Sequence, residues 1–260
     1  FAQKMVKARR DALELASEVH ALEAREGEKR TLRLSLPMNL NRVTLISQIM
    51  TYEDRHPDVR VEISADSGLP ALIAGKTDVS LGSYYRPDPR LFALPAGICY
   101  SFIMATKKYE RKYGLPETIE DLKHHTILLR YTQNLGYSNK LENGTETYYI
   151  DRGHRVQHGD AAACREMLLA GEGLAIDLTP GFVSDYLASG FVFPVLKGWH
   201  REPWHYHVYC RAGSQDDKVL RELMAYVERG VFATFANQWQ FWYGKLGIPM
   251  PEGFVPQSKS

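Results

Sequence analysis

Residues 31–82 alternate between strand patterns and short helical patterns, and this alternation limits the possible folds more than any other feature of the sequence. The order is TLRLSL, an apolar helical stripe from Val43 to Met50, VRVEI, LPALIAG and DVSLGS. The strands have period two, and HPD at Pro57 ends the first helix. Two successive strand–helix–strand units predict a parallel sheet with right-handed crossovers.

A second round of the same pattern follows, so we expect an α/β protein with two similar subdomains. Its segments are CYSFIMAT, ETIEDLKHH, TILLRY, a hairpin-like stretch with TYYI, HRVQHGD, AAACREMLLAG, LAIDL, FVSDYLAS and FVFPVL. The late strand HYHVYC and an amphipathic helix capped by Ser214 or Asp216 have no sheet of their own. We expect them to return to the first subdomain, with crossovers near Ser101 and Val208.

The N-terminal segment predicts a long helix that self-associates. It has no proline or glycine before Gly27, and its apolar residues are spaced by threes and fours. They are Phe1, Met5, Ala8, Ala12, Leu15, Val19 and Leu22. This is the seam of a coiled coil. The alternative is a surface helix that folds back onto its own domain.

The composition gives no sign of a nucleic-acid or membrane surface. The chain has 32 Lys and Arg against 31 Asp and Glu, a formal net charge of +1, so we expect no general attraction to DNA or anionic lipid. No stretch approaches the roughly 20 apolar residues of a membrane span, and the charged N-terminus lacks a signal-peptide core. The 3 cysteines are widely separated without CxxC spacing, which favours buried free thiols in a reducing compartment.

Motifs of the common enzyme classes are missing from the sequence. There is no GxSxG, Walker loop or HExxH, and the GEG at 171–173 precedes a strand, so it indicates the end of a helix. His200, His205 and His207 in WHREPWHYH offer a metal site, but alternating histidines in an aromatic strand favour packing. We therefore expect no catalytic residue, cofactor or metal.

Four short motifs occur in the order that is typical of LysR-type transcriptional regulators. GEKRTLRLSL is similar to the run that follows the linker helix of that family. YEDRHPDVRVEI, LIAGKTDVSLG and AGEGLAIDLTP are similar to three segments of its effector-binding domain. With the heptad helix before them, these motifs make the chain resemble this family from Phe1 to about Phe235.

The resemblance implies an α/β fold of two Rossmann-like subdomains, of the type II periplasmic-binding-protein kind. Two crossover strands would join the subdomains, and a long linker helix would precede them. The implied division is a linker and dimerisation helix at 1–27, subdomain I at 31–101 plus 208–235, subdomain II at 102–207 and a C-terminal extension at 236–260.

The resemblance also implies a function, the sensing of a small-molecule effector between the two subdomains of a bacterial, cytoplasmic regulator. Such a regulator would be a homodimer or homotetramer, with RNA polymerase as a further partner and no membrane contact. Promoter DNA would be bound only through an N-terminal winged helix-turn-helix that this sequence lacks, so we expect no specific DNA binding from it. The alternatives are a solute-binding protein of a transporter, which has the same two-lobed fold, and an unrecognised α/β enzyme.

Polar and aromatic residues at strand ends and helix starts would face the cleft and are the candidate effector-binding residues. They are Met38, Asn39, Asn41, Ser67, Tyr84, Arg130, Tyr131, His158, Asp177, Thr179 and Trp204. Capping is the alternative role for Asn39, Asn41 and Ser67, and packing for the aromatic residues.

Arg130 and Asp177 carry the charge of this predicted site. Arg130 follows the apolar strand TILL, where a guanidinium can hold a carboxylate through two hydrogen bonds; a surface ion pair is its alternative. Asp177 shares a strand face with Ala175 and Thr179 at the carboxyl end of LAIDL, and a helix cap near Gly181 is its alternative. We assign Arg130 direct contact with a small carboxylate, aromatic carboxylates included, and Asp177 an orienting role.

Overall fold

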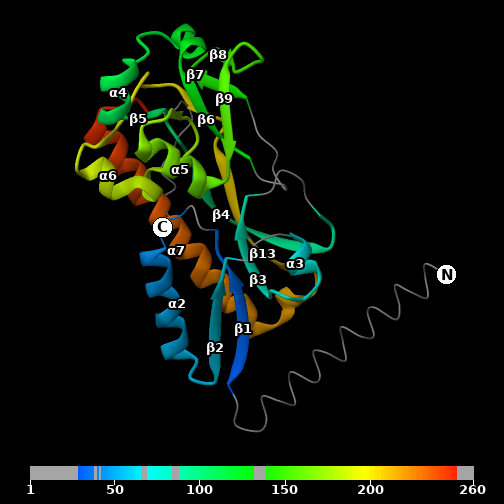
Figure 1. Ribbon diagram of the computed structural model, residues 1–260. Coiled ribbons are helices and arrows are strands. Elements are labelled where there is room, and N and C mark those ends of the chain that lie inside the picture. Colours follow the sequence, from blue (N-terminus) through cyan, green and yellow to red (C-terminus); the bar gives the residue numbers. More distant parts are fainter. Residues whose placement is uncertain are drawn as a thin grey trace, which may run out of the picture.

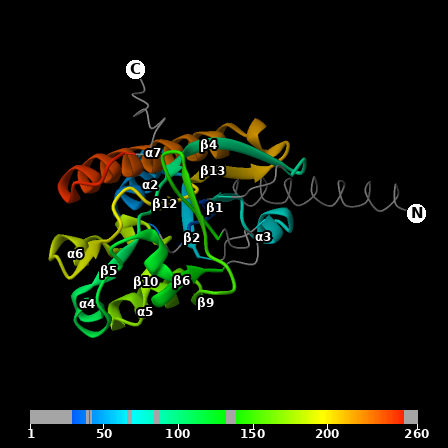
Figure 2. The same cartoon turned by 90° about the horizontal axis from the view of Figure 1, so that it is seen from above.

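The computed structural model describes residues 29–37, 40, 42–65, 69–83, 88–131 and 139–250. Within these ranges it is a mixed α/β structure with two sheet-rich parts, one above the other in Figure 1, and Figure 2 shows it from above. The fold class predicted from the sequence is confirmed. The predicted heptad helix at 1–27 lies outside the described residues.

The first sheet has the strand order β2-β1-β3-β13-β4. Its elements are β1 (Arg30–Ser35), α2 (Val43–Arg55), β2 (Val59–Ser64), α3 (Leu69–Ile73), β3 (Val79–Gly82), β4 (Leu91–Cys99) and β13 (Trp204–Arg211). β1 pairs in parallel with β2 and β3, as the two strand–helix–strand units predict, and β13 pairs antiparallel with β3 and β4. α2 packs against the long helix α7 (Lys218–Leu246), which lies along β4 and β13.

The second sheet has the order β11-β5-β10-β6-β9. Its elements are β5 (Met104–Thr106), α4 (Lys107–Tyr113), η2 (Ile119–His124), β6 (Thr126–Arg130), β9 (Arg155–Gly159), α5 (Ala161–Ala170), β10 (Leu174–Ala175), η3 (Pro180–Val183), α6 (Ser184–Ala188) and β11 (Val192–Pro194). β9, β6 and β10 are parallel, and β5 runs antiparallel to β10 and β11. The carboxyl ends of β6 and β10 therefore lie at the same edge of this sheet.

A small third sheet, ordered β12-β7-β8, packs beside the second sheet, since Leu141 of β7 shares a buried apolar cluster with Ile127 and Leu129 of β6. The predicted hairpin is present as β7 (Lys140–Asn143) and β8 (Glu146–Tyr149), joined at Gly144 in a left-handed conformation. β12 (His200–Arg201) adds to β7, with Arg201 opposite Leu141. The hairpin thus fixes a segment that comes much later in the chain.

The chain crosses between the first two sheets at two short segments. Residues 100–103 link β4 to β5, close to the predicted crossover at Ser101. The return comes earlier than predicted, since β13 already pairs with β4 from Trp204 onward, four residues before Val208. The subdomain boundaries given above stay a prediction.

Several strand and helix limits differ from the predicted ones. β4 was not predicted, because Pro95 and Gly97 interrupt its pattern; the proline is tolerated because β4 is an edge strand. The strand predicted at 174–178 stops after Ala175. The predicted caps Ser214 and Asp216 form the separate turn η4 (Ser214–Asp216), and Asp217 caps the following helix.

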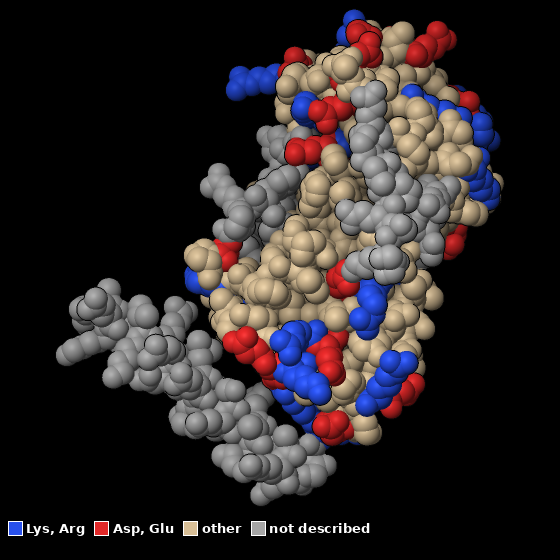
Figure 3. Space-filling view, turned by 180° about the vertical axis from the view of Figure 1, so that it is seen from behind, with Lys and Arg blue, Asp and Glu red and all other residues tan. Residues whose placement is uncertain are grey.

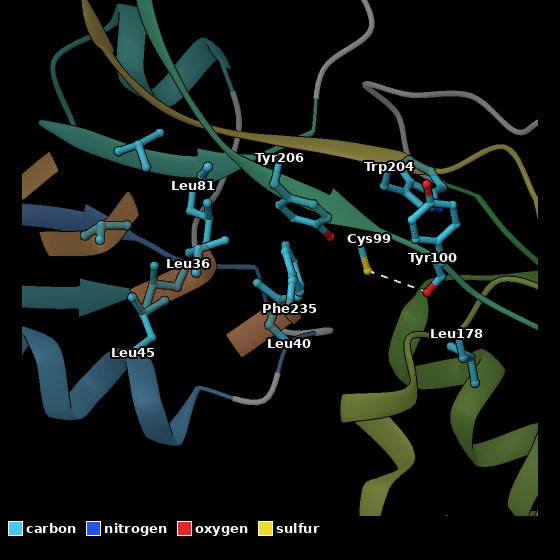
Figure 4. Close-up of a cluster of buried hydrophobic side chains, with 14 of the residues drawn as sticks. Leu36, Leu40, Leu45, Leu81, Cys99, Tyr100, Leu178, Trp204, Tyr206 and Phe235 are labelled. Atoms are coloured by element: carbon cyan, nitrogen blue, oxygen red, sulfur yellow. Dashed lines mark hydrogen bonds between the residues drawn. The ribbon is translucent and has the colours of Figure 1, made fainter. Parts of the chain in front are cut away.

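One apolar core extends across both large sheets. It joins Leu34 and Leu81 of the first sheet to Met104 and Leu128 of the second through aromatic side chains such as Phe102. Figure 4 shows part of this core, from Leu36 and Leu45 to Leu178 near η3. The packing of the two sheets is therefore continuous around the crossings.

Candidate functional site

Four buried side chains from all three sheets meet where the chain crosses between the large sheets. Arg130 ends β6, Asp177 follows β10, Arg201 ends β12 and Trp204 begins β13. Their exposed fractions are 5, 0, 1 and 4%. We call these four residues the arginine–aspartate cluster.

Asp177 is the centre of the cluster. Its Oδ2 accepts hydrogen bonds from the Arg201 Nη1 at 2.5 Å and from the backbone N–H of Arg130 at 3.2 Å. The same oxygen lies 3.4 Å from Arg130 Nε. Asp177 and Arg130 are thus in direct contact, and the alternative role of Asp177 as a helix cap is wrong, since the N-cap residue of η3 is Thr179.

The indole ring of Trp204 contacts both guanidinium groups. The Cζ atoms of Arg130 and Arg201 lie 4.6 Å and 5.4 Å from the ring centroid, within the range of cation–π attraction. Trp204 therefore provides a flat apolar wall for the two cations.

The cluster contains more positive than negative charge. Burial alone would lower the pKa of Arg130, but the charge of Asp177, with smaller effects of Tyr206 and Cys99, holds that pKa above its ordinary value. Of the charged groups of this cluster, Asp177 Oδ1 and the Nε atoms of Arg130 and Arg201 are buried without a hydrogen-bond partner in the described part of the chain. Two guanidinium groups share one carboxylate, so the cluster as described has the chemistry of an anion site.

Local sequence explains why β6 and β10 bring these charges together. TILL in β6 is almost entirely buried, which places Arg130 at the end of a core strand. Gly173 lets β10 approach, because a methyl group there would lie 2.7 Å from Leu128 Cδ2. Asp177 then follows at the same edge of the sheet as Arg130.

Arg201 was not among the predicted site residues. It lies in WHREPWHYH, where the histidines were the obvious candidates, and the two-residue strand β12 has no detectable periodicity. Its side chain is among the largest fully buried ones in the described residues. The position of Arg201 between aromatic residues was the one sequence feature that could have marked it as a site residue.

The other predicted residues differ in how close they come to the cluster. Tyr131 is 49% exposed beside Arg130, and His158 is exposed on the neighbouring strand β9. Thr179 is buried two residues after Asp177. Five predicted residues lie outside the described part of the chain: Met38, Asn39, Asn41, Ser67 and Tyr84.

The cysteines and histidines form no second chemical centre in the described part of the chain. All three cysteines are buried, and burial raises the pKa of Cys99 and Cys164 to about 12 and that of Cys210 to about 11. His207 Nδ1 donates to the carbonyl of His205 at 3.1 Å, and no group of three His, Cys, Asp or Glu suited to a metal occurs among the described residues.

Charged residues are mixed on the face shown in Figure 3, where basic and acidic side chains adjoin at both ends and mainly uncharged residues lie between them. The helices of the described ranges are all too short or too polar to cross a membrane.

Known regulators of transcription resemble this chain in sequence. An HTH-type transcriptional regulator of Xanthomonas campestris is 27% identical over 180 residues, which cover 66% of this chain and 51% of that protein. The HTH-type transcriptional regulator CrgA of Neisseria meningitidis is 27% identical over 201 residues, 75% of this chain and 65% of CrgA. The chain thus spans about half to two thirds of the length of these relatives.

Solved structures share the fold. The regulatory domain of CrgA has a TM-score of 0.62 at 20% identity, covering 77% of this chain and 98% of that domain. Full-length AphB, a virulence activator of Vibrio cholerae, has a TM-score of 0.63 at 21% identity, covering 85% of this chain and 76% of AphB. The family model of the LysR substrate binding domain matches residues 25–231. The chain therefore belongs to the LysR substrate-binding domain family, as the motifs indicated.

Proposed function

We propose that this effector-binding domain senses a small carboxylate, held by the guanidinium groups of Arg130 and Arg201 against Trp204. The single observation that carries the proposal is the charge of the arginine–aspartate cluster, two buried cations that share Asp177. A buried cation without a counter-charge is costly, so an anion at this site would be stabilised.

The geometry of arginine favours a carboxylate over other anions of the same charge. A guanidinium can donate two parallel hydrogen bonds to a planar carboxylate. The Trp204 ring beside both guanidinium groups adds a flat surface that suits a planar, aromatic effector. Asp177 would then orient the two arginines. Its carboxylate would repel a carboxylate effector if it lay closer to that effector than the two guanidinium groups do.

Other parts of the proposed function concern the whole regulator. DNA binding through an N-terminal winged helix-turn-helix, a partnership with RNA polymerase and work in the cytoplasm are proposals that rest on the relatives being HTH-type transcriptional regulators. These relatives also disfavour the transporter alternative and the enzyme alternative.

We also propose that the domain forms homodimers or higher oligomers through α2 and β2. Large apolar side chains on the outer face of α2 are 75, 37 and 60% exposed, and one on β2 is 38% exposed. They are Val43, Ile46, Met50 and Ile63. Their spacing along α2 forms a continuous stripe, which is typical of a protein–protein interface.

A binding screen tests the carboxylate proposal. Thermal shift with a panel of small carboxylates and their neutral amides, such as benzoate and benzamide, should show stabilisation by at least one carboxylate and none by its amide. Arg130→Ala or Arg201→Ala should abolish the shift, whereas Arg90→Ala, which removes an exposed arginine paired with Asp88, should retain it. Equal shifts by acid and amide, or full retention in both cluster variants, would contradict the proposal.

A further inference from the structure

The second half of α7 belongs to neither large sheet alone. The family match ends at Val231, yet the helix continues without a break to Leu246, through the residues predicted to form a separate extension. The helix packs against β4, β13 and α2, and further contacts reach η3 beside the second sheet. Figures 1 and 2 both show its red end next to α6.

Gln238 contacts the start of η3 closely. A methyl group on Gly181 would lie 2.4 Å from Gln238 Nε2 and 2.6 Å from its Oε1. Gly181 does not have a positive φ, and the atoms that a methyl group there would meet all belong to the end of the Gln238 side chain, which would have to move. The amide of Gln238 therefore rests directly on the backbone of η3.

The end of α7 is fixed to the segment between β11 and β12. Lys197 Nζ donates to the carbonyl of Leu246 at 2.7 Å, and the last carbonyls of a helix otherwise lack partners and attract cations. Gly247 ends the helix in a left-handed conformation, and the Ile248 N–H donates to the carbonyl of Tyr243 at 2.9 Å. This end is thus anchored on the segment that leads to Arg201.

Apolar contacts reinforce the same region. Trp242, Tyr243 and Ile248 are at most 6% exposed. The ring of Tyr243 packs edge-on against Phe102, at 5.7 Å between centroids, and Phe102 lies in the first crossing between the sheets. Residues 238–248 therefore contact the crossing, η3 and the β11–β12 segment together.

We propose that residues 238–248, the strap, set the orientation of the second sheet relative to the first. Two short crossings alone would permit a hinge motion, as in other two-lobed proteins. A helix that packs on both sheet-rich parts, here called the first and second lobe after their sheets, adds a third connection. The second lobe can therefore move only if the strap separates from η3 and Phe102 or if α7 bends. This inference goes beyond the proposed function and does not depend on which effector binds.

Distance measurement between spin labels tests the strap directly. Lys76→Cys and Lys123→Cys place labels on exposed positions of the first and second lobe, and the three native cysteines are buried. Labelled chains are diluted with unlabelled chains so that only distances within one chain contribute. The parent should give one narrow distance distribution.

Two sets of variants loosen the strap in different ways. Gly181→Ala with Lys197→Met displaces the Gln238 amide and removes the bond to Leu246, and Tyr243→Ala removes the contact with Phe102. Both should broaden the distribution. The hydrogen-exchange rates of η3 and α6 amides should rise roughly tenfold, because the loss of one contact worth about a hydrogen bond changes an opening equilibrium by that factor. The amides of α2 should keep their protection.

The matched control is Gly244→Ala on the same helix, because a methyl group there meets nothing within 4 Å. It should behave as the parent does. Distance distributions of both strap variants equal to that of the control would overturn the proposal. So would an equal loss of protection in α2 and η3, since that result indicates general unfolding and no hinge.

Discussion

Replacing Asp177 by asparagine tests the arginine–aspartate cluster in the absence of any effector. The amide would keep an oxygen of similar position but would leave the charges of Arg130 and Arg201 without a buried counter-charge. Asp177 is 0% exposed and contacts both arginines, and removing one partner of a buried ion pair costs about 3–5 kcal/mol. At roughly 2–4 °C per kcal/mol for a domain of this size, the melting temperature should fall by about 6–20 °C.

A double variant separates the charge from the shape of the side chain. Asp177→Asn with Arg201→Met removes one charge of each sign, so it should be more stable than the sum of the two single variants predicts. The control is Asp88→Asn, which breaks an exposed pair with Arg90 and should change stability little. Calorimetric melting of these variants and the parent is the assay, and a melting temperature of Asp177→Asn equal to that of the parent would refute the reasoning.

Three further predictions concern other parts of the molecule. Met50→Glu should shift sedimentation towards smaller species, whereas Arg111→Glu on exposed α4 should not; equal masses would show that the α2 stripe plays no part in assembly. Ellman's reagent should react with no cysteine of the native protein and with all 3 after denaturation, and a fast-reacting native thiol would contradict their burial. Alkaline pH should destabilise the fold, because unfolded thiols ionise near pH 9 while Cys99, Cys164 and Cys210 stay protonated to about pH 11 or 12. The unfolded chain then loses protons first, so stability falls as pH rises through this window, and an unchanged urea midpoint from pH 8 to 11 would exclude the effect.

Period-two strands with long apolar runs were predictable from the sequence. β1, β2 and β3 have strong local patterns with glycine or proline stops between them, and their parallel pairing follows from the helices that separate them. The meeting of Arg130 and Asp177 was predictable for the same reason, since Arg130 ends and Asp177 follows buried parallel strands whose carboxyl ends share an edge.

Features fixed by distant pairing were not predictable in this way. β12 is two residues long and forms because β7 lies beside it, so no local signal marks Arg201 as a site residue. β4 contains Pro95 and Gly97, and β13 supplies the partner that makes it a strand. The continuation of α7 past Phe235 likewise depends on contacts with η3 and Lys197, which lie far away in the sequence.

A crystal structure with a carboxylate from the binding screen tests the central claim most directly. We expect the carboxylate oxygens at about 2.7–2.9 Å from guanidinium nitrogens of Arg130 or Arg201, the range of charge-assisted hydrogen bonds, with Asp177 still in contact with both arginines. A carboxylate bound elsewhere, with both guanidinium groups still occupied by Asp177 alone, would contradict the claim.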